Sequence, residues 1–365
     1  MENLVNEKLF GGIYEGKRVL ITGHSGFKGS WLSLWLKQMG AVVSGFSLND
    51  LTSPSHFELV NSGIETFHGD VRDRKLLETV FSKVKPDIVF HLAAQSLVRE
   101  SYRDPIYTYE TNVMGTLNVL DVALKTPGIK AFVNVTTDKV YENLEQATAF
   151  REHDKLGGND MYSSSKACSE ILTISFRNSF LKDHPMLLAS ARAGNVIGGG
   201  DWANERLVPD LVLGTQNNIP AEIRSPKSIR PWEHVLEPLS GYLLLGQKLL
   251  EGKKEFADSW NFGPKPEQTL EVGIIVDLMQ KQWSKIRFKI NEAEAKKFHE
   301  AGILMLDCSK ASGKLKWEAV WDINTTINKT ANWYKDFYEN KKVNTLDDLH
   351  AYINDAKQQS IIWTN

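Results

Sequence analysis

The stretch KRVLITGHSGFKGSWLSLWLKQMG, residues 17–40, decides the fold. Residues 17–22 are rich in β-forming side chains, and apolar residues later recur at helical spacing. Between the two elements, Gly23, Gly26 and Gly29 form a Gly-x-x-Gly-x-x-Gly turn. Glycines there permit a tight bend, close helix packing and close approach of the backbone to a pyrophosphate at the helix N-terminus. The stretch therefore predicts a dinucleotide-binding turn, with an ordinary turn as the alternative.

The same strand–helix pattern continues along the first 190 or so residues. We expect further strands at 41–48, 64–70, 87–94, 130–137 and 186–197, and helices at 74–84, 107–124 and 160–180. Such alternation is typical of βαβ units that form a parallel sheet covered on both faces.

The rhythm breaks after Gly194, where Gly, Pro, Asn and Trp concentrate. This composition favours pocket-forming loops, with occasional helices such as Val235–Leu250, over a second regular sheet. The predicted fold class is α/β: a Rossmann-like, doubly wound parallel sheet with a smaller, loop-rich α/β C-terminal domain for substrate. We expect the cofactor domain at 1–190, with about 233–263 added to it, the substrate domain at 191–347 and a C-terminal tail at 348–365.

Composition excludes several classes of function. The chain has 365 residues, with 43 Lys and Arg against 45 Asp and Glu, and a formal net charge of −2. This balance lacks the basic surface of a nucleic-acid or membrane binder, so an anionic ligand must meet local positive groups. The two cysteines, Cys168 and Cys308, form no CxxC unit or His cluster, which indicates reduced thiols and no metal site. With no apolar signal segment at the N-terminus, we expect a cytoplasmic protein.

Several residues near the carboxyl ends of the expected strands are candidates for cofactor contact. Lys28 either lies near the phosphates or is a solvated lysine at the helix start. Asp70 either contacts adenine or caps a helix. Asp50 is the only acid near the position that usually holds a ribose hydroxyl, and no arginine occurs between residues 41 and 71 to bind a 2′-phosphate, which favours NAD over NADP. The full candidate set for cofactor contact is Gly23, His24, Gly26, Phe27, Lys28, Gly29, Asp70, Val71, Leu92, Ala93, Ala94, Tyr162 and Lys166.

Two further motifs point to proton transfer. Tyr162 and Lys166, in YSSSK, lie four residues apart and so share one helix face. A nearby ammonium favours the phenolate, which makes the tyrosine a candidate base. Thr137, Asp138 and Lys139 follow an apolar strand directly and offer hydroxyl, carboxyl and amine groups. We interpret this cluster as the edge of a site, with a loop cap as the alternative.

These motifs together resemble a known family. The segments GHSGFKG, HLAAQS, TTDKVY, YSSSK, SARAGNVIGGGDW and RPWEHVLEPL are similar to those of the nucleotide-sugar 4,6-dehydratases of the extended short-chain dehydrogenase/reductase family. The segment 306–334 resembles the C-terminal signature of that family, so the likeness spans about residues 15–338. Members that act on CDP-linked glucose are the most similar, because they share GFKGSWLSLWL and the Asp138–Lys139 pair.

The resemblance implies an internal redox cycle on bound NAD in the biosynthesis of deoxysugars for polysaccharides. Tyr162, helped by Thr137, takes the proton of the sugar 4-hydroxyl while hydride leaves C4. Asp138 protonates the departing 6-hydroxyl, hydride returns to C6, and the product is a 4-keto-6-deoxy sugar. In relatives that act on dTDP-glucose, a glutamate stands at the position of Lys139 and removes the C5 proton. We hypothesise that Lys139 does so here, which requires a neutral fraction of this lysine.

The resemblance also implies contacts to the sugar nucleotide. Asn195 and Arg230 fall where the family holds the diphosphate, and a guanidinium suits that anion because it donates two hydrogen bonds at once. Arg206 is a second candidate, with a solvated loop arginine as its alternative. Gln95 and Ser96 are expected beside the sugar. Helices at Tyr107–Leu124 and Asp160–Phe180 would pack against a second copy in a homodimer or homotetramer.

Two other classes of function remain in view. An epimerase or reductase on the same scaffold would lack paired groups for elimination, which Asp138 and Lys139 supply. A non-catalytic NAD-binding protein would have no use for Thr137, Tyr162 and Lys166 together. No residue in the sequence gives a physical reason to prefer cytosine over thymine or guanine.

Overall fold

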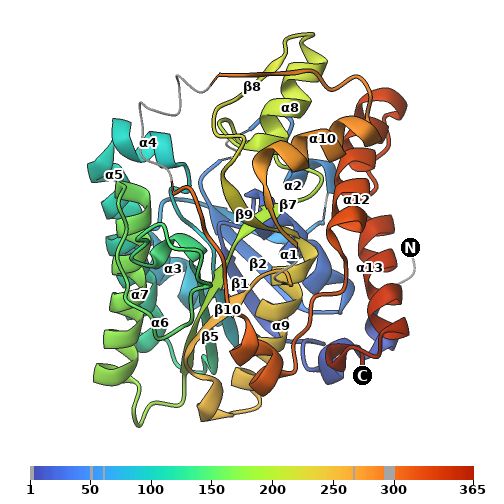
Figure 1. Cartoon of the computed structure of the whole chain (residues 1–365). Helices are drawn as coiled ribbons and strands as arrows, with labels where there is room; N and C mark the ends of the chain where they lie inside the picture. Colours follow the sequence, from blue (N-terminus) through green and yellow to red (C-terminus); the bar gives the residue numbers. More distant parts are fainter. Residues whose placement is uncertain (1–3, 50–51, 61, 266–267, 292–300) are drawn as a thin grey trace.

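A computed structural model describes residues 4–49, 52–60, 62–265, 268–291 and 301–365. Its centre is a sheet of seven strands in the order β10-β6-β5-β4-β1-β2-β3 (Figure 1). Every pairing in this sheet is parallel, so the predicted parallel sheet is confirmed. The strands are β1 (Arg18–Thr22), β2 (Val42–Ser47), β3 (Glu65–His68), β4 (Ile88–His91), β5 (Ala131–Val135), β6 (Leu187–Ala193) and β10 (Ser259–Phe262).

Helices cover both faces of the sheet because successive side chains of a strand point to opposite faces. Val19 and Ile21 of β1 pack into one core cluster, whereas Leu20 between them belongs to another. The first cluster includes side chains of α1 and α9, and the second includes side chains of α3, α6 and α7. These helices are α1 (Phe27–Gln38), α3 (Arg74–Val84), α6 (Thr116–Lys125), α7 (Met161–Phe180) and α9 (Leu236–Leu250).

The order of the strands reverses between β1 and β4. The chain runs outward through β2 and β3, then returns to place β4 on the other side of β1, where Thr22 pairs with His91. In open α/β sheets, ligands bind beyond the carboxyl ends of the strands at this point. Both the glycine turn after β1 and the segment after β4 lie at this edge.

The expected helix at 107–124 starts earlier and is not uniform. It begins as α5 (Pro105–Tyr109), passes through a π-helical turn at Glu110–Gly115 and continues as α6. The side chain of Asp104 accepts a hydrogen bond from the Tyr107 backbone N–H at 2.9 Å, and proline suits the first helical position because its missing N–H is not needed there. A short α4 (Val98–Arg103) precedes it.

The second part of the chain contains more regular structure than expected. Two small sheets form, one of β7, β9 and β11 and one of β8 and β12. Four of these five strands have three residues, which is too short to give a visible alternation in the sequence. The elements are β7 (Asn195–Ile197), β8 (Ala221–Ile223), β9 (Ile229–His234), β11 (Thr269–Glu271), β12 (Phe288–Ile290), α8 (Leu207–Gln216), α10 (Val272–Gln282) and α12 (Ile323–Lys335).

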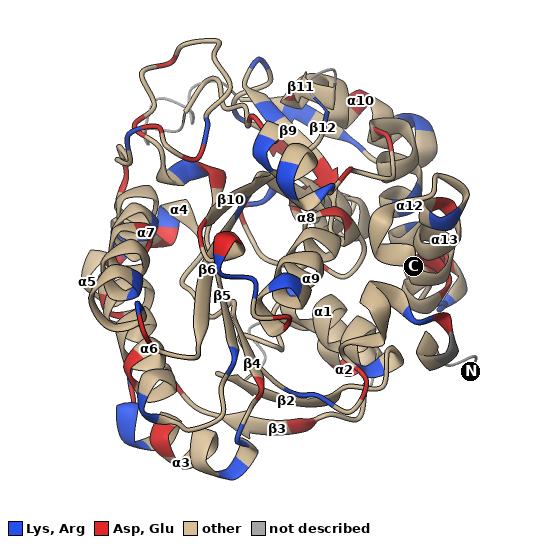
Figure 2. Cartoon of the chain, turned by 90° about the horizontal axis from the view of Figure 1, so that it is seen from below, with Lys and Arg blue, Asp and Glu red and all other residues tan. Residues whose placement is uncertain are grey.

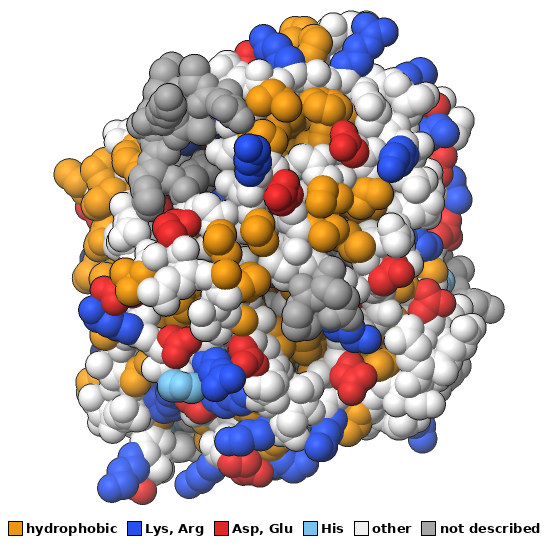
Figure 3. All heavy atoms as spheres, viewed as in Figure 1, with side chains coloured by type: hydrophobic (Ala, Val, Ile, Leu, Met, Phe, Trp, Pro, Cys, Tyr) orange, Lys and Arg blue, Asp and Glu red, His pale blue; other side chains and the backbone are white. Residues whose placement is uncertain are grey.

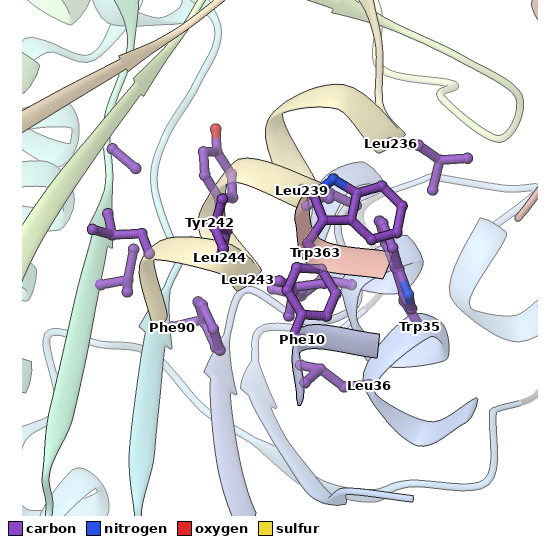
Figure 4. Close-up of a cluster of buried hydrophobic side chains, with 14 of the residues drawn as sticks. Phe10, Trp35, Leu36, Phe90, Leu236, Leu239, Tyr242, Leu243, Leu244 and Trp363 are labelled. Carbon is purple, nitrogen blue, oxygen red and sulfur yellow. The ribbon is translucent and has the colours of Figure 1, made fainter. Parts of the chain in front are cut away.

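The C-terminal segment packs against the first part of the chain. Helix α13 (Thr345–Gln358) is followed by Trp363, whose ring stacks on Phe10 at 5.3 Å and meets Trp35 of α1 at 5.6 Å. Figure 4 shows these three rings together beside Leu239 and Leu243 of α9. Residues 348–365, expected as a tail, thus contribute to the main core cluster.

Charged residues of both signs are spread over the surface. Figure 2 shows positive and negative residues interspersed over the helices and loops. Within the described ranges no helix is long and apolar enough to cross a membrane. Across the same residues no three His, Cys, Asp or Glu side chains gather as a metal site would need, and both cysteines are free thiols.

Candidate active site

The glycine turn has the geometry that its spacing predicts. Gly23 has φ of +76°, and a Cβ atom on it would lie 2.7 Å from the backbone nitrogen of Ala93, after β4. A Cβ atom on Gly29 would lie 2.1 Å from the carbonyl oxygen of Gly23, so helix α1 starts in direct contact with the turn. A Cβ atom on Gly26 would be 3.4 Å from that same oxygen, its nearest neighbour. Gly26 therefore leaves open space in front of the helix N-terminus.

A cavity of about 710 Å³ runs from this turn into the second part of the chain. All the predicted site residues except His24 line it. They are Gly23, Gly26, Phe27, Lys28, Gly29, Asp70, Val71, Leu92, Ala93, Ala94, Gln95, Ser96, Thr137, Asp138, Lys139, Tyr162, Lys166, Asn195, Arg206 and Arg230.

His24 lies behind the turn rather than in the cavity. Its ring is buried, packs edge-on against Phe57 at a centroid distance of 4.8 Å and occupies the space beside Gly45. Only its backbone belongs to the cofactor turn. Asp50, the acid considered for a ribose contact, lies outside the described residues.

Thr137 and Asp138 form one unit at the carboxyl end of β5. The Thr137 hydroxyl donates to Asp138 Oδ1 at 2.9 Å, and the Asp138 side chain is almost fully buried. Oδ2 is also buried and finds no hydrogen-bond partner in the described part of the chain. Burial raises the pKa of Asp138, although Lys139, Thr137 and other neighbours oppose the shift. Burial favours the protonated form of a carboxyl group, and a protonated carboxyl group can donate its proton to a leaving group.

Tyr162 stands next to this unit on the first turn of α7. Asp160 starts the helix by accepting a hydrogen bond from the Ser163 backbone N–H at 2.8 Å. Burial raises the pKa of the Tyr162 phenol to about 12, while a hydrogen bond with Thr137 and the charge of Arg206 lower it. Arg206 therefore favours the phenolate, a role that its position in the sequence did not reveal.

Lys166 lies one turn further along α7. Its ammonium donates to the carbonyl oxygen of Val135 at 3.0 Å, and burial lowers its pKa to about 8. Glu170, on the next turn, accepts hydrogen bonds from Ser190 at 2.8 Å and from Arg192 at 2.8 Å inside the core. These contacts fix α7 against the sheet, and so they fix the two side chains that face the cavity.

The structure decides between the alternatives for Lys28. Its side chain is partly buried and lines the cavity, and its Nζ lies 6.0 Å from the centre of the Tyr242 ring. Burial lowers its pKa to about 8, while the charge of Glu233 opposes this shift. Lys28 therefore faces inward toward the catalytic candidates and is not a solvated residue at the helix start.

Glu233 is a buried carboxyl group that the sequence gave no reason to single out. It is 2% exposed, and among the described residues neither of its carboxylate oxygens has a hydrogen-bond partner. Burial raises its pKa well above the usual range, with Lys28 the strongest opposing charge. Its place within RPWEHV resembles that of any strand residue, so only the fold shows that it lies behind the cavity.

Asp70 is not the helix cap. That cap is Asp73, whose side chain accepts from the Leu76 backbone N–H at 3.1 Å. Partial burial would raise the pKa of Asp70, but hydrogen bonds from the Arg72 side chain and backbone outweigh burial and lower it. Asp70 therefore borders the cavity as a charged group paired with Arg72.

Gln95 and Arg206, two candidates for substrate contact, already make hydrogen bonds within the protein. The Gln95 side chain is taken up by Leu97 and by Thr108 Oγ1, the latter at 2.9 Å. Arg206 bonds Asp201 Oδ2 at 3.0 Å and Ser96 Oγ at 2.8 Å. Gln95 thus holds its own loop in shape, whereas Arg206 connects two walls of the cavity.

Asn195 and Arg230 lie on neighbouring strands of the second sheet. Asn195 starts β7, which pairs in parallel with β9, where Arg230 lies. The Arg230 guanidinium donates to the carbonyl oxygens of Ala301 and Gly302. Both side chains line the same cavity, opposite the sheet that holds the glycine turn.

The far end of the cavity contains charged residues that sequence reasoning missed. Glu205 and Asp210 flank the start of α8, and Arg224 follows β8. Nothing in ANERLVPD or AEIRSP marks these residues as different from ordinary loop charges. Only the packing of the second part onto the first brings them to one cavity.

A known family matches this fold and site. A family model described as GDP-mannose 4,6 dehydratase matches residues 20–330. The chain therefore belongs to this family of nucleotide-sugar 4,6-dehydratases, as its motifs predicted, and has the Rossmann-like fold of the extended short-chain dehydrogenases/reductases.

Individual relatives differ in closeness. The CDP-glucose 4,6-dehydratase of Salmonella typhimurium is 49% identical over 329 residues, which make up 88% of this chain and 91% of that protein. The UDP-glucose 4-epimerase of Rhizobium meliloti is 28% identical, over 88% of this chain and 98% of its own length. The dTDP-glucose 4,6-dehydratase of Streptomyces venezuelae, solved with NAD and TYD bound, has a TM-score of 0.71 and 25% identity, over 87% of this chain and 97% of that one.

Proposed function

We propose that the chain converts CDP-glucose to CDP-4-keto-6-deoxyglucose by eliminating water, with NAD as its bound cofactor. The observation that carries this proposal is that one cavity holds Tyr162, Thr137 and a buried, partly unpartnered Asp138 beside the glycine turn. The 49% identity to a CDP-glucose 4,6-dehydratase over most of both chains supports this substrate. The product is a precursor of deoxysugars.

The residues at the turn fit NAD. Gly26 leaves room for a pyrophosphate at the N-terminus of α1, where backbone N–H groups and the helix dipole favour anions. We assign cofactor contact to the cavity-lining members of the predicted set, from Gly23 to Lys166. When bound, NAD accepts a hydride from sugar C4 and returns it to C6, so the reaction has no net oxidation.

The protein supplies the proton transfers. Tyr162 accepts the proton of the 4-hydroxyl, because its phenol lies next to Thr137 and within the field of Arg206. Lys166 holds the region between α7 and β5 through Val135 and adds positive charge. Once C4 is a ketone, the hydrogen on C5 is acidic, and its removal by a base allows the 6-hydroxyl to depart as water with the proton of Asp138. C5 takes a proton back from that base when C6 is reduced, which completes the 4-keto-6-deoxy product.

We assign the removal of the C5 proton to Lys139. Its side chain lines the cavity directly after Asp138, so the acid and the base come from consecutive residues at the end of one strand. In a strand, consecutive side chains point to opposite faces. A short 3₁₀ turn over Asp138–Val140 ends this alternation, so Asp138 and Lys139 can both face C5 and C6 of the sugar. Asn195, Arg206 and Arg230 provide the positive and polar groups for the diphosphate of the substrate.

We divide the chain into a cofactor part and a substrate part according to the sheet with which each segment packs. Residues 1–190, together with about 233–263, form the cofactor part, because α9 and β10 pack with the seven-stranded sheet. Residues 191–347 form the substrate part around the third core cluster. We place the reaction in the cytoplasm, in keeping with two free thiols.

The proposal is tested by incubating the protein with CDP-glucose in D2O and analysing the product by mass spectrometry and NMR. We expect a 4-keto-6-deoxy sugar with solvent deuterium at C5 and no consumption of added NAD. Because UDP-glucose 4-epimerases share the fold, an epimer that keeps its 6-hydroxyl is the main competing outcome. That product, or net reduction of NAD, would exclude a dehydratase.

Two glycine variants separate the roles of the turn. Gly29→Ala places a Cβ atom into a backbone carbonyl, so we expect the free energy of unfolding to fall by about 3 kcal/mol or more. Gly26→Ala meets no such clash, so the fold should persist while NAD affinity falls at least about tenfold (1.4 kcal/mol). Thermal unfolding and NAD titration of both variants check this contrast, and equal thermal stability of the two variants would contradict it.

We propose that the protein is a homodimer held together by the helices on one side of the sheet. Apolar side chains there are exposed: Ile106, Met114, Ile171 and Phe180 are each at least half exposed. Figure 3 shows hydrophobic side chains along the edge where Figure 1 places α4, α5 and α7. Large exposed apolar side chains on neighbouring helices support an interface there.

The proposed interface predicts a specific change of mass. Ile171→Glu, on α7, should convert a particle of twice the 41.2 kDa chain mass into a monomer, because a charge would be buried without a partner. Ile219→Glu is the matched control, since Ile219 is also exposed but follows α8. Light scattering after size exclusion gives both masses. A dimer that survives Ile171→Glu would place the interface elsewhere.

A further inference from the structure

The cavity continues past the groups assigned to the cofactor, the sugar and the diphosphate. Its far end lies between the start of α8 and β8, which sit above β9 at the top of the molecule (Figure 1). Glu205, Asp210 and Arg224 line this end. If the diphosphate of the substrate binds at Arg230, its nucleobase would lie at this far end of the cavity, because the opposite end is occupied by the cofactor at the glycine turn.

The backbone of Glu205 holds the other two residues. Its N–H donates to Asp210 Oδ1 at 3.1 Å, and its carbonyl oxygen accepts from Arg224 Nη2 at 3.3 Å. The Asp210 carboxylate and the Arg224 guanidinium are therefore both hydrogen-bonded to the backbone of Glu205, one through its N–H and the other through its carbonyl oxygen. Both are fixed by the loop rather than by each other.

Acceptor capacity is left over at this end. Glu205 Oε1 accepts from Arg103 Nη2 at 2.9 Å, but Glu205 Oε2 is buried and has no hydrogen-bond partner within the described residues. Burial raises the pKa of Asp210 to about 6, even though the charges of Arg224 and Arg99 oppose the shift. Among the described residues Glu205 Oε2 thus lacks a donor that a ligand could supply, and the Asp210 carboxylate stands next to Glu205 at the same end of the cavity.

Only some nucleobases supply such donors. Cytosine offers the two hydrogens of its 4-amino group, followed along the same edge by two acceptors, N3 and O2. Uracil and thymine offer a carbonyl oxygen at position 4 and an N–H at position 3. Carboxylates accept from an amino group, and a guanidinium can donate to two adjacent acceptors. The pattern at this end of the cavity matches cytosine and opposes uracil and thymine.

We propose that Glu205, Asp210 and Arg224 select cytosine over uracil and thymine. The two carboxylates accept the hydrogens of the 4-amino group, and Arg224 donates to N3 and O2. This inference rests on the proposed function, because it takes the substrate to be a pyrimidine nucleoside diphosphate sugar. It supplies the physical reason for a nucleobase preference that the sequence alone lacks.

The test compares CDP-glucose with UDP-glucose in the same enzyme preparations. For the wild type we expect a ratio of kcat/KM that favours CDP-glucose. Asp210→Asn and Glu205→Gln should each lower this ratio by about tenfold or more, since a lost hydrogen bond to a charged group changes binding by that amount. A variant that is partly unfolded has less active enzyme for both substrates. The ratio of the two kcat/KM values is therefore unaffected by a partial loss of folding.

Glu222→Gln is the matched control. Glu222 stands at the rim of the same cavity, but its carboxylate is engaged by Lys289 at 2.8 Å and by Asn291 at 3.1 Å. We expect this variant to keep the wild-type ratio. An unchanged ratio in both Asp210→Asn and Glu205→Gln, or an equal fall in Glu222→Gln, would overturn the proposal.

A binding measurement separates this proposal from the proposed function. Calorimetric titration of the wild type with CDP and with UDP requires no turnover. Tighter binding of CDP, with a smaller difference in Asp210→Asn, supports cytosine selection even if CDP-glucose is not dehydrated. Equal affinities for CDP and UDP in the wild type would refute cytosine selection, whatever reaction the enzyme performs.

Discussion

Replacing Asp138 by Asn is expected to stop the loss of water while leaving the exchange of the C5 proton in place. The amide has the shape of the carboxyl group and can still accept from Thr137, but it has no acidic proton to give to the departing 6-hydroxyl. Loss of a general acid typically lowers a rate by about 10²- to 10⁴-fold. The rate of formation of the 4-keto-6-deoxy product should fall by that factor.

Mass spectrometry of the sugar nucleotide after incubation with CDP-glucose in D2O measures two changes: the gain of deuterium at C5 and the loss of water. Asp138→Asn should yield recovered sugar nucleotide that carries deuterium at C5 but keeps its 6-hydroxyl. Lys139→Met should show neither deuterium at C5 nor loss of water, because the base itself is missing. Asp183→Asn, in an exposed loop, is the control for the change of charge. If Lys139→Met still exchanged the C5 proton, a base other than Lys139 would act there.

Asp138→Asn should also change the pH dependence of stability. Burial raises the pKa of Asp138 above its unfolded value, so the folded state holds the proton more tightly. The stability contributed by this group is therefore complete below the unfolded pKa, and it is lost as pH rises through the folded pKa. The Asn variant removes this dependence. We expect it to gain thermal stability relative to the wild type as pH rises from about 4 toward neutrality, the range above the ordinary aspartate pKa.

Tyr162→Phe is expected to abolish the first step. The variant loses only a hydroxyl group, so the ring keeps its place in the cavity and both ligands should still bind. Without the phenol the group that we assign to take the proton of the 4-hydroxyl is missing, and we expect kcat to fall by about 10²- to 10⁴-fold. Neither exchange at C5 nor loss of water should then be seen, because both need the 4-ketone.

The control for this variant is Tyr109→Phe. Tyr109 also bonds a residue of α7, donating to Ser164 Oγ at 2.8 Å, but it does not line the cavity. It should retain kcat within about threefold, since surface hydroxyl groups contribute little. A Tyr162→Phe enzyme with near-native kcat would mean that another group removes the proton.

Arg206 provides a pH-dependent check on the same step. Its positive charge lowers the pKa of Tyr162, so Arg206→Gln should raise that pKa and move the acidic limb of the kcat profile to higher pH. The shift in kcat, rather than in KM, distinguishes an effect on Tyr162 from weaker substrate binding. An unshifted limb would assign Arg206 to binding alone.

Much of the fold could be predicted from the sequence because its signals are local. Gly23, Gly26 and Gly29 sit between a strand and a helix; a side chain at Gly23 or Gly29 would collide with backbone atoms, whereas Gly26 leaves space open at the helix N-terminus. Alternating faces of the strands and the spacing of Tyr162 and Lys166 are likewise set within a few residues. The short strands β8, β11 and β12 escaped prediction because three residues carry no period, and the expected strand at 186–197 divides into β6 and the three-residue β7.

Contacts between residues far apart in the sequence could not be predicted from it. The stacking of Trp363 on Phe10 joins residues at opposite ends of the chain, so a segment expected as a tail became part of the core. Arg206 acts on Tyr162 across the cavity, and Glu233 lies behind Lys28. No local pattern marks these pairs, since each residue alone resembles an ordinary loop or strand residue.

By itself, therefore, the sequence determined the parallel sheet and the glycine turn, and it predicted which residues transfer protons, because strand period, glycine sterics and i,i+4 spacing act over short distances. Only the tertiary structure decided which charges stand together. Burial raises the pKa of Asp138 and, within the part of the chain that the structure describes, leaves one oxygen of Glu205 without a partner; burial is a property of the packed chain. The preference for cytosine that we infer is likewise set by the tertiary structure, because it depends on where α8 and β8 meet the cavity.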